Sequence, residues 1–277
     1  TDGRSEKLLG RLLKGARRRK VFLATKAYPG QLGPGKPPGL TPGSVRGQLE
    51  TSLTRLRTDC VDLFYLHAPD NRTPLGVTLA ACEELRREGK LRELGLSNYA
   101  SWQVAECVAL CRANGWKPPL VYQGMYNALT RDIERECIAA CRHFGLKLLA
   151  YNPLAGGLLT GKHTAIGHVP DKGRFSGAYY RDRFWKPEYF EALRRVAEAA
   201  QSRGITPSQA ALRWLRHHSM ADGLLLGASK LDHLKENLEA CRMPRLPASV
   251  VRALDAAWET ARPACQQYFR DERTVQP

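Results

Sequence analysis

Short apolar runs and longer mixed stretches follow one another along the whole chain, and this pattern predicts strands alternating with helices. Nearly continuous apolar runs are typical of buried strands, and we expect strands at 21–26, 61–66, 91–96, 120–126, 146–150 and 224–228. Between them, apolar residues recur at helical spacing. This spacing predicts amphipathic helices at 1–15, 44–56, 75–89, 101–114, 131–144, 188–203, 207–218, 231–240 and 249–261. The stretches 30–40 and 163–186 are expected to be a loop and an insertion without regular structure.

The first predicted helix carries a leucine stripe that should form its buried face. The stripe consists of Leu8, Leu9, Leu12 and Leu13. Asp2 or Ser5 has the side chain that caps a helix start, so we expect one of them to be the N-cap.

Regular strand–helix alternation predicts an α/β protein with a parallel sheet, and strands this apolar should be buried on both faces. Polar residues gather where these strands end, among them Lys26, His67, Ser97, Asn98, Gln123, Asn152 and Ser229. In a (β/α)8 TIM barrel, the carboxyl ends of the strands form the catalytic face. The sequence therefore predicts a TIM barrel, with six of its eight strands visible. We expect 1–277 to form one domain, with 271–277 as a flexible tail.

The stretch LKLLAYNPLAGGLLTGK, from Leu146 to Lys162, joins a predicted strand to a glycine-rich turn. The apolar run ends at Asn152-Pro153, which is a turn signal, and small residues follow. Small residues let backbone N–H groups approach an anion closely, while Thr160 and Lys162 add a hydroxyl group and a positive charge. A nucleotide phosphate would fit this arrangement, although an ordinary surface loop after a core strand has the same pattern.

The chain is strongly basic, with 43 Lys and Arg residues against 27 Asp and Glu residues and a net charge of +16. Its densest cluster, Arg17-Arg18-Arg19-Lys20, is of a kind that can bind nucleic acid. The cluster follows a predicted helix, where cations also complement the helix dipole, and no aromatic residues interleave it. We therefore expect a solvated basic surface that attracts a phosphorylated cofactor, and no nucleic-acid partner.

The eight cysteines form no C-x-x-C pair, although Cys107 and Cys111, like Cys137 and Cys141, lie four residues apart on predicted helices. Such pairs share one helix face and can bind a metal, but reduced thiols are the more common case. No stretch reaches the roughly 18 apolar residues that a membrane span needs, and no signal peptide opens the chain. We expect a cytoplasmic protein with reduced cysteines and without a membrane partner.

Several motifs together resemble the aldo-keto reductases, and most closely their aflatoxin-aldehyde and succinic-semialdehyde reductase subfamily (family 7). They are, in chain order, ATKA at 24–27, YLHAP at 65–69, LGLSNY at 94–99, YQGMYN at 122–127, YNPLAGGLLTGK at 151–162, GRF at 173–175, YRDRFW at 180–185, AALRWLRHHS at 210–219, GASKLDHLKEN at 227–237 and YFR at 268–270. The resemblance implies a TIM barrel with two further βα units upstream of Thr1. The barrel is therefore expected to be N-terminally incomplete, as a fragment or a splice-type product, with an open edge at strand 21–26.

The resemblance also implies hydride transfer from a nicotinamide to a carbonyl carbon while a tyrosine hydroxyl protonates the oxygen. Because an unperturbed phenol is a weak acid, a neighbouring lysine must lower its pKa. Lys26 matches that lysine, and His67 matches the histidine that orients the carbonyl. The family's tyrosine and aspartate would fall upstream of Thr1, so the chain alone is expected to be close to inactive. Tyr28 could replace the acid only if the strand continued past Pro29, which the turn there disfavours.

By the same resemblance, an NADPH cofactor would contact residues at several strand ends. Ser97, Asn98 and Gln123 would bond the nicotinamide carboxamide, and Tyr151 would stack on the ring. The pyrophosphate would lie along Asn152, Pro153, Leu154, Gly157, Leu158, Thr160 and Lys162, with Arg174 near the cofactor. The 2′-phosphate end of the adenosine would be held by Ser229, Lys230, His233 and Asn237. These last residues open a predicted helix, where an anion is favoured, although Ser229 could equally be an ordinary N-cap.

Tyr180, Arg183 and Arg270 match positions at which the subfamily binds a substrate carboxylate, a task that suits the arginine fork, and His67 would contact the same substrate. We therefore expect NADPH-dependent reduction of aldehydes such as succinic semialdehyde or dialdehydes by a homodimer. The alternative is a non-catalytic homologue that binds nucleotide or a sister subunit, because two catalytic residues of the family fall outside this chain.

Overall fold

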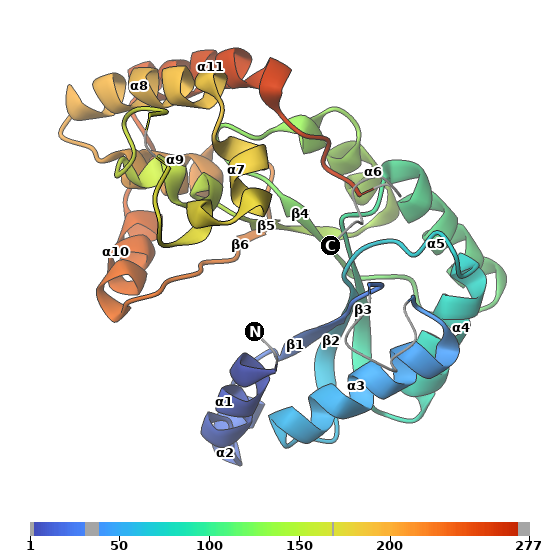
Figure 1. Cartoon of the computed structure of the whole chain (residues 1–277). Helices are drawn as coiled ribbons and strands as arrows, with labels where there is room; N and C mark the ends of the chain where they lie inside the picture. The colour runs from blue at the N-terminus through green and yellow to red at the C-terminus, as the bar shows by residue number, and fades with distance from the viewer. Residues whose placement is uncertain (1–2, 31–38, 168, 271–277) are drawn as a thin grey trace. The chain divides into compact units, whose positions relative to one another are not determined.

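The computed structural model describes residues 3–30, 39–167 and 169–270 and has the predicted α/β architecture (Figure 1). Its strands are β1 (Ala24–Ala27), β2 (Val61–Leu66), β3 (Leu91–Ser97), β4 (Val121–Met125), β5 (Lys147–Tyr151) and β6 (Gly223–Leu224). They form a six-stranded sheet in which spatial order follows chain order. The pairs β1–β2, β2–β3, β3–β4 and β5–β6 are parallel, as a repeated βα pattern requires. The α/β class predicted from the hydrophobic pattern is thus confirmed.

The helices follow the strands in turn. The α-helices are α1 (Arg4–Leu12), α2 (Ala16–Arg19), α3 (Pro42–Leu56), α4 (Leu75–Arg87), α5 (Ser101–Ala113), α6 (Cys137–Phe144), α7 (Ala178–Phe184), α8 (Pro187–Gln201), α9 (Pro207–His217), α10 (Leu231–Arg242) and α11 (Ala248–Ala261). Short 3-10 helices are η1 (Asp132–Glu134), η2 (Ala155–Thr160), η3 (Arg174–Ser176) and η4 (Arg262–Ala264). The stretch 163–186, expected to lack regular structure, thus contains η3 and α7.

The chain divides into two compact units. Unit 1 holds the described residues within Thr1–Gln123, Ala140–Lys147 and Phe269–Pro277, and unit 2 holds those within Gly124–Ala139 and Leu148–Tyr268. The expectation of a single domain stays a prediction. The predicted tail 271–277, residues 31–38 of the predicted loop and Asp2 lie outside the described residues.

The core of unit 1 is the face between the sheet and helices α3 to α5. Val45, Leu49, Leu53 and Leu56 of α3 are all buried, as their helical spacing requires. A side chain such as Leu49, with no exposed surface, contributes about 1.5–3 kcal/mol by burial. Thr41 caps this helix, because its side chain accepts a hydrogen bond from the Ser44 N–H at 3.3 Å.

Helix α1 differs from its prediction. Its N-cap is Gly3, without a side-chain cap, and Leu8 and Leu12 are 48 % and 49 % exposed, so the buried leucine stripe was wrong. The helix instead contacts α3 through Gly10, whose missing Cβ would lie 2.3 Å from the Arg55 carbonyl oxygen. Glu6 is held between the Arg55 guanidinium, at 3.2 Å, and the Thr25 hydroxyl, which donates to it at 2.6 Å. A close backbone approach and an ion pair, not leucine packing, therefore orient α1.

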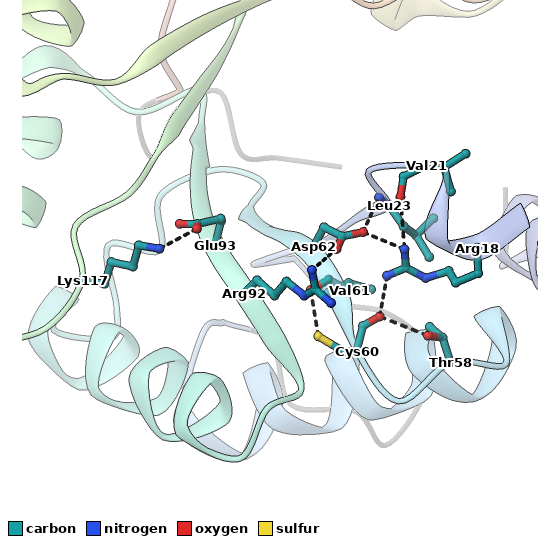
Figure 2. A network of polar contacts seen from close by, with 10 residues as sticks. All are labelled: Arg18, Val21, Leu23, Thr58, Cys60, Val61, Asp62, Arg92, Glu93 and Lys117. Atoms are coloured by element: carbon teal, nitrogen blue, oxygen red, sulfur yellow. Dashed lines mark hydrogen bonds and ion pairs between the residues drawn. The ribbon is translucent and has the colours of Figure 1, made fainter. Parts of the chain in front are cut away.

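An ion-pair network at the amino end of β2 fixes the segment between α2 and β1 (Figure 2). The Arg18 guanidinium donates to an Asp62 carboxylate oxygen at 2.8 Å and to the Cys60 carbonyl at 2.9 Å. The same carboxylate oxygen accepts the Leu23 N–H at 2.8 Å. Burial raises the pKa of Asp62, but these hydrogen bonds and the charges of Arg18 and Arg92 bring it below its usual value. One arginine of the predicted basic cluster is thus neutralised inside the protein.

Unit 2 buries its core between β5 and the helices α8, α9 and α11. Trp214 of α9 is 2 % exposed, and the Arg131 guanidinium lies 4.0 Å from its ring centroid. Arg131 also forms an ion pair with Asp255 of α11 at 2.8 Å, which ties the segment after β4 to the last helix. Strand β6 is shorter than the predicted 224–228, because the chain leaves the sheet after Leu224.

The cysteines are free thiols. Five are buried, namely Cys82, Cys107, Cys111, Cys137 and Cys141, and the other three are half-buried. Within the described ranges, no group of three metal-ligating side chains is placed to hold a metal ion. Among the helices of this described part, none has the length and apolar character needed to cross a bilayer.

Candidate active site

Unit 1 brings Lys26 and His67 to the carboxyl ends of neighbouring strands. Lys26 is the penultimate residue of β1, and His67 directly follows β2. The His67 N–H donates to the Ala27 carbonyl at 2.9 Å, which continues the β1–β2 ladder by one residue. Side chains that follow adjacent parallel strands lie together at the carboxyl-terminal end of the sheet, which is where α/β proteins place their sites.

The His67 imidazole is held in its neutral form. Burial lowers its pKa, the positive charges of Lys26 and Arg270 lower it further, and the result is about 4. The Tyr28 ring packs edge-on against the imidazole, with 5.6 Å between ring centroids. A neutral imidazole offers one N–H donor and stays uncharged across the physiological pH range, which suits it to polarise a carbonyl oxygen.

Lys26 is largely buried at the same end of the sheet. Burial lowers the pKa of its ammonium group. Its Nζ lies 4.7 Å from the centroid of the Tyr65 ring, within cation–π distance.

The residues after β3 complete this polar cluster. Asn98 has a φ of 61°, a left-handed conformation that asparagine tolerates better than most residues. Its amide nitrogen donates to the His67 carbonyl at 2.8 Å and to the Ser97 hydroxyl at 3.0 Å. Ser97 is in register with Gln123 of β4, and the Arg270 N–H donates to the Asn98 carbonyl at 3.0 Å. The polar residues predicted at the ends of β1 to β4 thus lie together with Arg270.

A cavity of about 780 Å³ lies beside this cluster, lined by the segments that follow β2 and β3 and by Phe269 and Arg270. Trp102, near the start of α5, lines it with 65 % of its surface exposed, and Arg72 is another lining residue. Neither residue was predicted, because a single tryptophan at a helix start or a single arginine on a loop carries no motif. Their position after strand ends is the one signal the sequence offers.

Unit 2 contains a second cavity, of about 880 Å³, at the end of β5. Most of the residues predicted to bind the cofactor from Tyr151 onward line it: Tyr151, Asn152, Pro153, Leu154, Gly157, Thr160, Lys162, Arg174, Ser229, His233 and Asn237. A cleft of this size is in the range that encloses cofactors.

Two predicted cofactor residues lie elsewhere. Leu158 has no exposed surface and belongs to the core, and Lys230 is exposed and is not among the lining residues. Lys230 is the N-cap residue of α10, so Ser229 precedes the cap position and does not itself cap the helix.

The turn after β5 is a tight left-handed turn that lines the cavity. Asn152, Ala155, Gly156 and Gly157 have φ values of 55°, 48°, 71° and 114°, all left-handed. The turn is closed by its own backbone, because the Ala155 N–H donates to the Asn152 carbonyl at 2.9 Å and the Gly157 N–H donates to the Leu154 carbonyl at 2.8 Å. A Cβ on Gly156 would lie 2.8 Å from the Tyr180 ring, so glycine is required there both for φ and for space. The Thr160 hydroxyl donates to the Gly157 carbonyl at 2.7 Å and so stabilises the turn itself.

The charged side chains on the walls of this cavity are mainly cationic. Lys162, Lys172 and Arg174 line it together with His163, and Glu236 is the acidic residue among the lining side chains. His163, Lys172 and Glu236 were not predicted, since 163–186 shows no period and Glu236 looks like any exposed helical glutamate. Their proximity to the predicted Lys162, Arg174 and Asn237 along the chain was the available signal. This charge distribution favours a phosphorylated ligand.

Helix α7 carries the two further residues predicted to bind substrate. The Arg174 guanidinium lies 5.4 Å from the Tyr180 ring centroid, and the Arg183 guanidinium lies 4.0 Å from that of Tyr179. The Nη1 of Arg183 is buried and finds no hydrogen-bond partner within the described part of the chain. A buried guanidinium nitrogen without a partner calls for an acceptor, and a ligand carboxylate would supply one.

Comparison with known proteins agrees with this geometry. Residues 1–259 match the model of the aldo/keto reductase family. Aflatoxin B1 aldehyde reductase member 2 of Homo sapiens is 51 % identical over 98 % of the chain and 79 % of its own length. The protein of that name from Mus musculus is 50 % identical over 97 % of the chain and 77 % of its own length. Aflatoxin B1 aldehyde reductase member 4 of Homo sapiens is 48 % identical over 97 % of the chain and 85 % of its own length. The chain therefore belongs to the aldo/keto reductase family and is an oxidoreductase.

Proposed function

We propose that the protein reduces aldehydes to alcohols with a hydride from NADPH, and that succinic semialdehyde and dialdehydes are among its substrates. Aldehyde reduction in general follows from the family and from relatives named as aldehyde reductases. The observation that carries the choice of a phosphorylated dinucleotide is the unit 2 cavity, which combines the left-handed turn after β5 with lysine, arginine and histidine side chains.

The residues of this cavity fit a phosphorylated cofactor. Open space lies beside Gly157, where a pyrophosphate would fit, and Lys162, Lys172 and Arg174 would balance its charge. Ser229, His233 and Asn237 would hold the adenosine end, and Lys230, which follows Ser229 in the chain, would contact a 2′-phosphate. Ser97, Asn98 and Gln123 would bond the carboxamide, and Tyr151 would stack on the ring. When bound, NADPH supplies the hydride.

The side chains of unit 1 prepare the carbonyl. Neutral His67 would donate its N–H to the carbonyl oxygen, and the rigid Asn98 amide, bonded to the His67 carbonyl, holds that residue in place. Lys26, largely buried, would provide the positive field that stabilises the developing alkoxide and lowers the pKa of the tyrosine hydroxyl that the family uses as proton donor.

Substrate selection would depend on arginine. Arg270 lines the 780 Å³ cavity and lowers the pKa of His67 through its charge, so a carboxylate bound to it would lie near the carbonyl site. Tyr180 and Arg183, with its unpartnered nitrogen, would bind acidic substrates in the same way. We further propose that the protein is a cytoplasmic homodimer without nucleic-acid or membrane partners.

The test is a paired measurement of binding and turnover. Fluorescence titration should show NADPH binding more tightly than NADH. In a protein that also carries the family's catalytic tyrosine and aspartate, NADPH oxidation at 340 nm should depend on added succinic semialdehyde. Binding without turnover would favour the non-catalytic alternative, and absence of NADPH binding would refute the proposed cofactor. His67→Gln should lower kcat about 10²-fold or more while leaving the NADPH Kd unchanged.

A further inference from the structure

Tyr65 spans three strands of unit 1 beneath the polar cluster. In the β-ladder, Lys26 of β1 is in register with Tyr65 of β2, and Tyr65 is in register with Gly95 of β3. Residues in register on parallel strands point to the same face of the sheet, so a side chain at Gly95 would compete with the Tyr65 ring for space. A Cβ on Gly95 would lie 2.5 Å from the ring Cδ1 and 2.6 Å from Cε1. The ring therefore lies directly over Gly95.

The two ends of this side chain contact two residues of the candidate site. One face of the ring is 4.7 Å from the Lys26 Nζ. Its hydroxyl is hydrogen-bonded to the side-chain amide of Gln123, on the far side of Gly95. Tyr65 is 1 % exposed and Gln123 is 7 % exposed, so neither group exchanges its partner freely with water. Burial raises the pKa of Tyr65 to about 12, which keeps the hydroxyl protonated at every pH of interest.

We propose that Tyr65 is a positioning residue that fixes the Lys26 ammonium with its ring face and the Gln123 amide with its hydroxyl, and that Gly95 exists to admit the ring. A primary amide has a donor end and an acceptor end, and the bond to Tyr65 determines which end faces the cofactor carboxamide. The ring face stabilises a cation whose burial is otherwise unfavourable. One side chain thus links the residue proposed to tune the proton donor with a residue proposed to orient the nicotinamide.

This inference rests on the proposed function for Gln123 and Lys26, and the first experiment separates the two. Tyr65→Phe keeps the ring and removes the hydroxyl. NADPH and 2′,5′-ADP, which lacks the nicotinamide, are titrated into wild type and variant. We expect Tyr65→Phe to raise the NADPH Kd about ten-fold while leaving the 2′,5′-ADP Kd unchanged. If wild type binds neither probe, the proposed cofactor is wrong. If wild type binds both and the variant binds both equally well, the role of the hydroxyl is refuted.

The second experiment isolates the ring face. Lysine acetylation is followed by mass spectrometry in wild type, Tyr65→Phe and Tyr65→Leu, with exposed Lys235 as the internal reference. Tyr65→Phe should react at Lys26 as slowly as wild type, because the ring remains. Tyr65→Leu should react at least three-fold faster at Lys26 and unchanged at Lys235. Equal rates at Lys26 in all three proteins would refute the role of the ring.

Gly95→Ala provides a second route to the same result if Tyr65→Leu does not fold. The added methyl group must displace the ring, so Lys26 acetylation should rise and the NADPH Kd should increase together. In the double variant Gly95→Ala with Tyr65→Leu, the alanine should have no further effect on either quantity, since the ring it displaces is gone. Additive effects would show that Gly95 acts independently of Tyr65.

Discussion

Asp62→Asn tests the ion-pair network that fixes the segment before β1 (Figure 2). The substitution keeps the shape of the side chain and removes its charge. Asp62 and Arg18 have side chains that are 7 % and 19 % exposed, so the pair is largely buried. Breaking a buried pair from one side costs about 3–5 kcal/mol. Arg18 retains its bonds to two carbonyl groups, and the asparagine oxygen can still accept the Leu23 N–H. We therefore expect a loss of about 2 kcal/mol in the free energy of unfolding.

The measurement is urea denaturation followed by circular dichroism, with Asp232→Asn as the matched control. Asp232 pairs with Lys235 at 3.5 Å and is 81 % exposed, so its loss should cost less than about 0.5 kcal/mol. Arg18→Met and the double variant complete a cycle, and a coupling energy of about 1 kcal/mol or more is expected between the two sites. A cost for Asp62→Asn no greater than that for Asp232→Asn would refute the reasoning.

The pH dependence of stability tests whether the charge of Asp62 stabilises the folded protein. The pKa of Asp62 is lower in the folded protein than in the unfolded chain, so its contribution is complete above the unfolded value and is lost as pH falls. The difference in stability between wild type and Asp62→Asn should therefore shrink below about pH 4. A constant difference down to pH 3 would show that the carboxylate charge is not what stabilises the segment.

Three further predictions concern the candidate site. Lys230→Met should weaken NADPH by about 1–3 kcal/mol more than NADH in fluorescence titration, and equal losses would contradict a 2′-phosphate contact. Arg270→Ala should raise KM for succinic semialdehyde and leave a neutral aldehyde nearly unchanged; equal effects on both would make the arginine structural. His67, whose pKa is about 4 when folded and near 6.5 when unfolded, should make the protein lose about 2.5 kcal/mol as pH falls from 6.5 to 4, and His67→Gln should reduce that loss in denaturation curves.

The fold was predictable wherever burial and apolar character coincide. Strand β2 was expected at 61–66 and is observed there, because every residue of it is buried. Strand β1 was expected from residue 21 but begins at Ala24, since Val21 and Phe22 are apolar yet 39 % and 63 % exposed. Leu8 and Leu12 of α1 are likewise apolar but exposed, so a buried stripe was predicted there incorrectly. Periodicity reports which residues are apolar, and it cannot report whether a neighbouring element covers them.

Much of the candidate site was predictable for a different reason. Lys26, His67 and Ser97 follow apolar runs, and parallel strands bring such positions to one edge whatever the details of packing. Tyr65 escaped notice because it sits inside an apolar run, where a tyrosine looks like core. Its role depends on a glycine thirty residues away on the next strand, and a contact of that kind is set by register. Lys172 and His163 were not predicted to line the site, because apolar residues show no regular spacing in 163–186.

The contact between the Tyr65 ring and Gly95 also constrains how this protein can change over generations. With the ring in place, any substitution at Gly95 meets an atom at about 2.5 Å and must displace the ring, so exchanging the glycine first is disfavoured. Loss of the ring is sterically permitted at any time, and it then frees the glycine to vary. Loss of the aromatic ring at position 65 should therefore precede substitution of Gly95. Homologues should show a side chain at the position of Gly95 only where the position of Tyr65 has already lost its ring.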